Sequence, residues 1–379
     1  MLKNLYGQKR VKHAQQELNA ILTAHERYVS YQGGVRAQLT HAELDGLNLA
    51  NRILKEAELS GASLVGATLY GSNLERASLY CADLRGCNLQ AANLRRADLR
   101  GASLKGAVLS YAVLDGADMR SAMMMYVGPG GVSLLDHNNA SGNGQDEDGV
   151  NTATGVDFSN CSLKHASFGS AKLDNVNFGG ALLEGAKFKG ARLKNAVFKG
   201  AVLTGVDLKE LDVPAHALEG CVKDPTAEAI AKAQSLKDAL ATHQEWVGSG
   251  GKTGRPASLD GQDLRPLKSE LKARVLAALS ARRTNAIGVD FSGCQLQAAK
   301  FDGADLRDCD FSDADLRGAS FKGARLAHAH FHGANLGGLP MASGTALNPD
   351  FSGSDAIAEQ FIGAQLDAPL ADLGLPACF

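Results

Sequence analysis

The chain has 379 residues, with 39 basic and 41 acidic side chains and a formal net charge of −2. Hydrophobic residues make up 45% but aromatic residues only 6%, so small and aliphatic side chains must supply most of the core. No stretch approaches the roughly 18 apolar residues of a membrane span. The near-neutral charge gives no overall attraction to nucleic acid or anionic lipid. We therefore expect a cytoplasmic protein with no membrane contact, and nucleic acid is disfavoured as a partner.

The N-terminal segment, residues 1–36, is predicted to be helical. Leu18, Leu22 and His25 follow one another at helical spacing and would share one face. An amphipathic helix at this place, ahead of a repetitive region, is typical of a terminal cap.

A repeat of five residues begins after this helix. A large apolar residue recurs at every fifth position over 39–124, 158–208 and 291–336, and Ala precedes it by two positions in 28 of 39 units. Each unit therefore reads Ala-x-Leu/Phe-x-x. A helix requires a spacing of 3.6 and a strand a spacing of 2, so the repeat is neither.

In each unit, the Ala side chain and the large apolar side chain would both point inward, and the chain would then turn a corner. This suits a short extended segment, which we call a step, followed by a tight turn. Four such steps would close a coil of twenty residues, and successive coils would stack through backbone hydrogen bonds about 4.8 Å apart. Large side chains would meet at the centre, and only small ones would fit at the wall, because close-packed interiors tolerate little extra volume.

This pattern resembles the pentapeptide-repeat family, whose members form right-handed quadrilateral β-helices, and the resemblance implies a bacterial protein. The resemblance implies an all-β fold, a right-handed quadrilateral parallel β-helix in three repeat blocks with α-helical capping and insert segments. It carries little information about function, since the repeat is a scaffold. The structural core is expected to include Leu84, Leu89, Leu94, Leu99, Phe168, Phe178, Phe188, Phe301, Phe311 and Phe321.

Differences between the repeats divide the chain further. Block 1 has Leu or Met at its centres, whereas Phe and Leu mostly alternate in the other two blocks, which should stack Phe in ladders on opposite faces. The predicted segments are a helical N-terminal cap (1–36), block 1 (37–126), a flexible linker (127–155), block 2 (156–213), a helical insert (214–287), block 3 (288–341) and an irregular C-terminal segment (342–379).

The helical insert should contain two helices. The first follows Pro225, with Leu236, Leu240 and His243 on one face, and the second follows Pro266. The second helix would place Leu267, Leu271, Val275 and Leu279 on one stripe.

The first helix of the insert repeats features of the N-terminal segment. His25 and Tyr28 are matched by His243 and Trp246, and a Gly-Gly pair follows each. We interpret this as a duplicated capping module. Two residues at wall positions, Leu47 and Arg52, are too large for the repeat, and we expect either the cap helix to pack there or a loop to bulge outward there.

No catalytic residues and no cofactor site are predicted. The outward-pointing His328, His330 and His332 are weak candidates for a metal site, but no carboxylate or Cys completes the set in sequence. Four of the seven cysteines occupy the Ala position, where they are expected to act as small core residues. The Gly-rich segment ending at Lys252 has Trp246 where a phosphate-binding loop needs Gly.

These features predict a non-enzymatic scaffold or adaptor that binds an unidentified protein partner through a rigid solenoid surface. A homo-oligomer is a second expectation. The run Met123–Met125 suits an adaptable interface at the end of block 1, which would be sealed either by block 2 of the same chain or by another chain. The alternative function is a DNA-mimicking modulator of DNA gyrase or topoisomerase. A mimic needs a sustained acidic column, whereas block 1 has 9 acidic and 9 basic residues.

Overall fold

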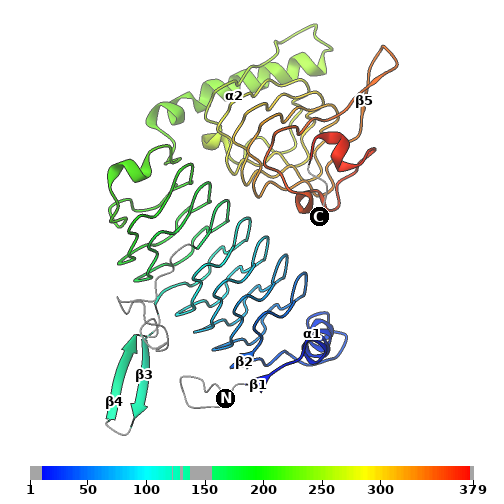
Figure 1. Cartoon of the computed structure of the whole chain (residues 1–379). Helices are drawn as coiled ribbons and strands as arrows, with labels where there is room; N and C mark the ends of the chain where they lie inside the picture. Colours follow the sequence, from blue (N-terminus) through cyan, green and yellow to red (C-terminus); the bar gives the residue numbers. More distant parts are fainter. Residues whose placement is uncertain (1–10, 122, 129–130, 137–155, 376–379) are drawn as a thin grey trace. The chain divides into compact units, whose positions relative to one another are not determined.

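The computed structural model describes residues 11–121, 123–128, 131–136 and 156–375. The chain forms two compact units, Met1–Asp224 and Pro225–Phe379. Each unit has a helix near its start, α1 (Gln15–Val29) in the first and α2 (Ala227–Gly248) in the second, followed by stacked coils (Figure 1).

Over most of the stack, the coils pair through parallel bridges between residues that are twenty positions apart. Ser63 pairs with Asp83, for example: Leu64 N–H donates to the Asp83 carbonyl at 2.8 Å, and Asp83 N–H donates to the Ala62 carbonyl at 2.9 Å. Such a bridge recurs every five residues, so each coil has four steps. Both units are therefore β-solenoids built from single-residue bridges rather than long strands.

A tight turn joins each step to the next. Cys87 N–H donates to the Leu84 carbonyl at 3.2 Å, and Gly86 between them has a φ of +65°. This left-handed conformation is accessible to Gly without steric cost, which explains why Gly is frequent at this place in the repeat.

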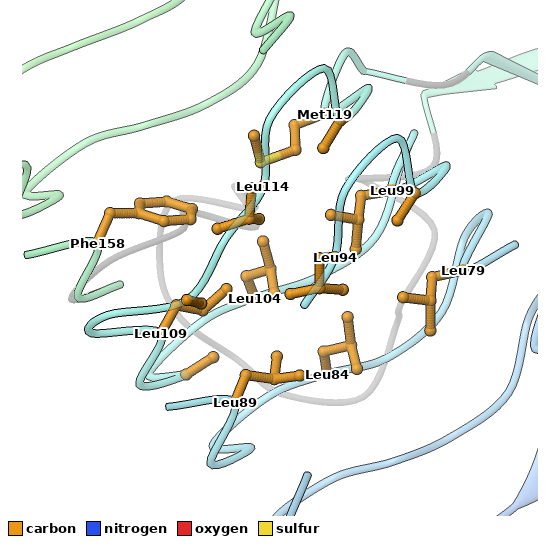
Figure 2. Packing of buried hydrophobic residues seen from close by; sticks show 14 of the residues in the cluster. Leu79, Leu84, Leu89, Leu94, Leu99, Leu104, Leu109, Leu114, Met119 and Phe158 are labelled. Atoms are coloured by element: carbon orange, nitrogen blue, oxygen red, sulfur yellow. The ribbon is translucent and has the colours of Figure 1, made fainter. Parts of the chain in front are cut away.

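The large residue of each unit points into the coil. Figure 2 shows these side chains meeting in the interior of the first unit. Leu84, Leu89 and Leu94 have no exposed surface and Leu99 is 2% exposed. Burial of each such side chain is worth about 1.5–3 kcal/mol. The six phenylalanines predicted for the core are also completely buried: Phe168, Phe178, Phe188, Phe301, Phe311 and Phe321.

Blocks 1 and 2 form one continuous solenoid. Val108 pairs with Asp157, and Val113 pairs with Ser162, across the insertion that separates the blocks in sequence. Part of the expected flexible linker is instead a strand, because β3 (Met123–Gly128) pairs antiparallel with β4 (Gly131–Asp136). Residues 137–155 lie outside the described part of the chain.

This hairpin changes the interpretation of the methionine run. Met124 continues the five-residue spacing in sequence, yet its backbone pairs with Leu135 in the hairpin. The repeat of block 1 ends at Met119, which is 8% exposed, and block 2 stacks directly on block 1. Met123–Met125 therefore do not form a coil step at the end of block 1.

Stacked phenylalanines fill the second half of the first unit, as the alternation predicts. The Phe158 and Phe178 rings stack at 5.4 Å, and Phe168 and Phe188 stack at 4.8 Å on the other ladder. Rings of the two ladders meet edge to face, as Phe168 and Phe178 do at 5.7 Å. Both arrangements are favourable for aromatic pairs.

The ladders of the second unit extend into the segment that was expected to be irregular. Phe351 stacks on Phe321 at 4.7 Å, and Phe361 stacks on Phe331 at 4.7 Å. An inserted hairpin of β5 (Leu339–Pro340) and β6 (Ala346–Leu347) interrupts the spacing and hides this last coil in the sequence.

The prediction of a second helix after Pro266 is wrong. Pro266 lies in a short 3₁₀ turn, η3 (Arg265–Leu267), and the chain then enters the coils. Leu279 occupies a wall position and Ala281 a central one, so large and small residues have exchanged places there. This exchange conceals the repeat and leaves leucines at helical spacing.

Short elements complete the two units. β1 (Val11–Lys12) pairs in parallel with β2 (Ala42–Glu43) and so adds a strand to the first coil. The remaining 3₁₀ turns are η2 (Ala215–Leu218), η4 (Ala358–Phe361) and η5 (Leu370–Leu373). None of the described helices combines the length and apolar character needed to cross a membrane.

Candidate binding site

The two capping motifs adopt the same arrangement in the two units. The Nδ1 atom of His25 accepts a hydrogen bond from Ala37 N–H at 3.1 Å, and Nδ1 of His243 accepts one from Ala257 N–H at 3.0 Å. Both histidines have no exposed surface. Tyr28 lies 6.1 Å from His25 between ring centroids, and Trp246 lies 5.6 Å from His243. Each histidine thus ties a cap helix to the first coil.

These histidines should make the stability of the caps depend on pH. Burial lowers the pKa of His25 and of His243 below the ordinary value of 6.5. Around His25, the charge of Arg36 lowers the pKa further, while Glu26 and Glu56 oppose the shift. The unfolded chain therefore binds more protons than the folded chain below pH 6.5.

We expect the free energy of unfolding to be fully retained above pH 6.5 and to fall as the pH drops from there toward the lowered pKa values. Urea titrations at a series of pH values measure this slope. The double variant His25→Gln/His243→Gln should reduce it, and an unchanged slope in that variant would assign the effect to other groups.

Arg52, one of the two oversized wall residues, contacts the cap helix. Its Nε donates to Glu26 Oε1 at 2.6 Å, and its terminal nitrogen donates to Glu26 Oε2 at 3.0 Å. Leu47, the other exception, is half-buried against the core. The first coil thus departs from the repeat where α1 packs on it.

The four cysteines at Ala positions are buried in the core. Their Sγ atoms lie within hydrogen-bond distance of carbonyls, as Cys87 does at 2.7 Å from the Leu64 oxygen. Burial raises the pKa of Cys87 to about 12 and that of Cys294 to about 11. Burial also raises the pKa values of Cys161 and Cys309 well above the ordinary value of a thiol.

These thiols should not react with an aromatic disulfide reagent in the native protein at mildly alkaline pH, because the thiolate is the reactive form. Mass spectrometry should locate label on Cys87, Cys161, Cys294 and Cys309 only after denaturation. Half-buried Cys221 provides the internal comparison, and it should react first. Rapid native labelling of the four would contradict this burial.

The three candidate metal ligands occupy different positions of the repeat. His330 pairs with Asp310 along the coil stack, His332 lies within 3.4 Å of the Ile362 carbonyl through Nδ1, and His328 occupies a left-handed turn. Across the described residues, no group of three His, Cys, Asp or Glu side chains is placed to hold a metal ion.

A cleft of about 1210 Å³ opens at the end of the first solenoid. One wall is formed by two steps of the last coil, residues 190–199, and the other is the segment around η2, residues 210–220. The lining residues are Gly190 to Lys199 together with Glu210, Asp212, Val213, Pro214, His216, Ala217, Glu219 and Gly220.

The coil wall of this cleft is an uncovered edge, which we call the open edge (residues 190–199). One coil earlier, Leu173 N–H donates to the Arg192 carbonyl at 2.7 Å and Arg192 N–H donates to the Ala171 carbonyl at 2.9 Å. If another coil were stacked on residues 190–199, it would make the same bonds with the open edge. In the described structure, the N–H groups of Leu193, Asn195 and Phe198 and the carbonyls of Ala191 and Ala196 have no such partners.

The chain leaves the coil path here. Leu211 and His216 stand twenty residues after Ala191 and Ala196, where most units of the repeat have a small side chain. The stack resumes at Val222, which pairs with Val202. Large wall residues do not by themselves predict this departure, because Leu47 and Arg52 occupy the same position within regular coils. The cleft could therefore not be read from the sequence.

The charge on the open edge is positive. Arg192 forms an ion pair with Asp174 of the preceding coil. Lys194 and Lys199 are exposed and have no ion-pair partner among the described residues. The opposite wall of the same cleft contributes the carboxylates of Glu210, Asp212 and Glu219.

Elsewhere, arginines cover the aspartates of the repeat. Arg100 binds both carboxylate oxygens of Asp98, at 2.8 and 2.6 Å, and Arg317 does the same for Asp315 at 2.9 and 2.7 Å. The same pairing occurs at Asp83–Arg85, Asp118–Arg120, Asp263–Arg265 and Asp305–Arg307. These bidentate pairs neutralise the aspartates that a DNA mimic would have to expose.

Comparison with solved structures finds several pentapeptide repeat proteins. One from the thylakoid lumen of Arabidopsis thaliana is 18% identical over 51% of this chain and 74% of its own, with a TM-score of 0.22. HetL from Nostoc, involved in heterocyst differentiation regulation, is 22% identical over 87% of this chain and 98% of its own, with a TM-score of 0.21. QnrB1, a plasmid-mediated fluoroquinolone resistance protein, is 19% identical over 53% and 91%, with a TM-score of 0.21. No curated protein matches the chain.

A family model for pentapeptide repeats matches more than half of the sequence. The matches are residues 35–69, 53–90, 87–124, 152–180, 181–213, 280–313 and 309–339. They fall on coils in both units and omit the first and the last coil of the second unit, where the repeat is concealed. The chain belongs to the pentapeptide-repeat family.

Proposed function

We propose that this protein is a non-enzymatic scaffold that binds another protein through the cleft at the end of its first solenoid. The observation that supports this is the open edge, where backbone donors and acceptors line a cleft without partners from the described chain. Unpaired strand edges of this kind recruit other chains.

The rest of the molecule suits a rigid support for such a site. Most central residues of the described coils have little or no exposed surface, so the solenoid interior is filled with side chains rather than hollow. Function then has to reside on the surface or at the ends of the coil stack. The free, buried cysteines are consistent with the reducing cytoplasm, where we place the protein.

Affinity capture from the native host, with the full chain as bait, tests the scaffold function. We expect at least one protein to be retained in a defined ratio to the bait. Size-exclusion chromatography with light scattering on the purified chain separates a different protein partner from self-association, which was the second expectation. A chain that is monomeric and retains no protein would contradict the scaffold function.

The alternative function, mimicry of DNA toward gyrase or topoisomerase, has less support. The arginine–aspartate pairs leave no sustained acidic column on the described coils. We expect micromolar protein to leave the rate of supercoiling by DNA gyrase unchanged, as measured on relaxed plasmid by gel electrophoresis. Inhibition that increases with protein concentration would favour the mimic.

A further inference from the structure

We propose that the open edge takes up a short, acidic segment of the partner, which adds to the last coil as two extended, parallel steps joined by a turn. This inference rests on the proposed scaffold function and specifies the chemistry of the partner.

The backbone groups of the open edge define the direction of the added strand. Every isolated bridge between successive coils is parallel. A strand in that direction would accept hydrogen bonds from the N–H groups of Leu193 and Phe198 and donate to the carbonyls of Ala191 and Ala196. These are the bonds that each coil makes with the next one elsewhere in the stack.

The opposite end of the same solenoid provides a precedent within the chain. β1 adds to the edge of the first coil in parallel, with Val11 opposite Ala42 and Lys12 opposite Glu43. Two residues of extended backbone are therefore sufficient to cover one step of a coil edge. The cleft leaves two steps of the last coil uncovered.

Charge favours acidic residues in the added strand. Its outward side chains would lie beside Arg192, Lys194 and Lys199, and opposite charges on neighbouring strands attract. Asp305 and Arg325 show this arrangement, since they pair on successive coils with 3.4 Å between the guanidinium and the carboxylate.

The facing wall restricts where those acidic residues can lie. Its three carboxylates would repel negative charge on that side, whereas Val213 and Pro214 offer apolar surface to the alternate side chains. We therefore expect acidic and apolar residues to alternate in the segment. A nucleic acid strand does not fit as well, because its phosphates accept hydrogen bonds but cannot donate to the carbonyls of Ala191 and Ala196.

Fluorescence anisotropy with the full chain and two labelled peptides tests this inference. The acidic probe has two copies of Ala-Asp-Leu-Asp-Gly, and the basic probe has Lys in place of each Asp. We expect the acidic probe to bind at least about tenfold more tightly than the basic probe. Its affinity should decrease as the salt concentration increases. Bound peptide should also slow amide hydrogen exchange at Leu193, Asn195 and Phe198.

A charge-reversed variant and a matched control locate the binding. The double variant Lys194→Glu/Lys199→Glu should bind the acidic probe about tenfold or more weakly, as expected when two close charge pairs are lost. Lys252→Glu/Lys300→Glu changes the net charge equally in the second unit and should leave binding unchanged. Circular dichroism checks that both variants are folded.

Several results would overturn the inference. These are binding of neither probe, equal binding of both, or binding without slower exchange at the three amides. If affinity capture retains a partner equally well on the Lys194→Glu/Lys199→Glu variant, the chain is a scaffold that binds its partner elsewhere, and the open edge is the wrong site. If capture retains nothing on the unmodified chain, the scaffold function itself fails.

Discussion

Phe311→Ala should lower the free energy of unfolding of the second unit by about 3–5 kcal/mol, the usual cost of truncating a buried aromatic residue. Phe311 is completely buried and stacks on Phe291 at 5.1 Å and on Phe331 at 5.3 Å. It also meets Phe301 at 5.8 Å and Phe321 at 5.6 Å edge to face. Alanine would leave a cavity in contact with all four rings.

Phe361→Ala is the matched control within the same ladders. Phe361 is 4% exposed and contacts only two of the described phenylalanines, Phe331 at 4.7 Å and Phe351 at 5.2 Å. We expect about half the loss, because fewer packing contacts disappear and the last coil can relax into the space. Urea unfolding, with hydrogen exchange to assign the transition to the second unit, measures both. Equal losses would mean that ladder position does not determine the cost.

The regular part of the fold could be predicted from sequence because its period is explicit. An inward residue at every fifth position leaves one geometry for the chain, and the buried Leu84 and Phe178 lie where that geometry places them. The same logic failed after Pro266, where Leu279 and Ala281 exchange the large and small positions. A coil requires only that the combined volume fits, so the pattern can invert without loss of packing.

Insertions and ends were harder to predict for a different reason. Two blocks that are out of phase in sequence can still stack, as Val113 and Ser162 show, because a loop absorbs the mismatch. The cleft depends on hydrogen bonds that the chain fails to make at Leu193 and Phe198. Whether a backbone group lacks a hydrogen bond depends on the path of the whole following coil. The residue types at single positions do not predict that path.

Gly34→Ala should release the N-terminal cap. Gly34 has a φ of +98°, and a Cβ at this position would overlap the Ala24 carbonyl oxygen in the α1 backbone. The left-handed conformation alone costs alanine about 1–2 kcal/mol. The overlap is with backbone, which cannot rotate away, so the total loss should exceed about 2 kcal/mol. Urea unfolding and faster amide exchange in α1 measure the effect.

Gly46→Ala separates the overlap from the conformational cost. Gly46 also has a positive φ, +67°, but a Cβ there would have no atom within 4 Å. The Gly46→Ala variant should lose only about 1 kcal/mol of its free energy of unfolding, and the amides of α1 should remain protected from exchange. The second unit repeats the comparison: Gly254 would overlap the Thr242 carbonyl, whereas Gly250 is open. Ala24 and Thr242 each directly precede a capping histidine. If the free energy of unfolding fell equally for Gly34→Ala and Gly46→Ala, or equally for Gly254→Ala and Gly250→Ala, the close contacts at Gly34 and Gly254 would not be what holds the cap helices.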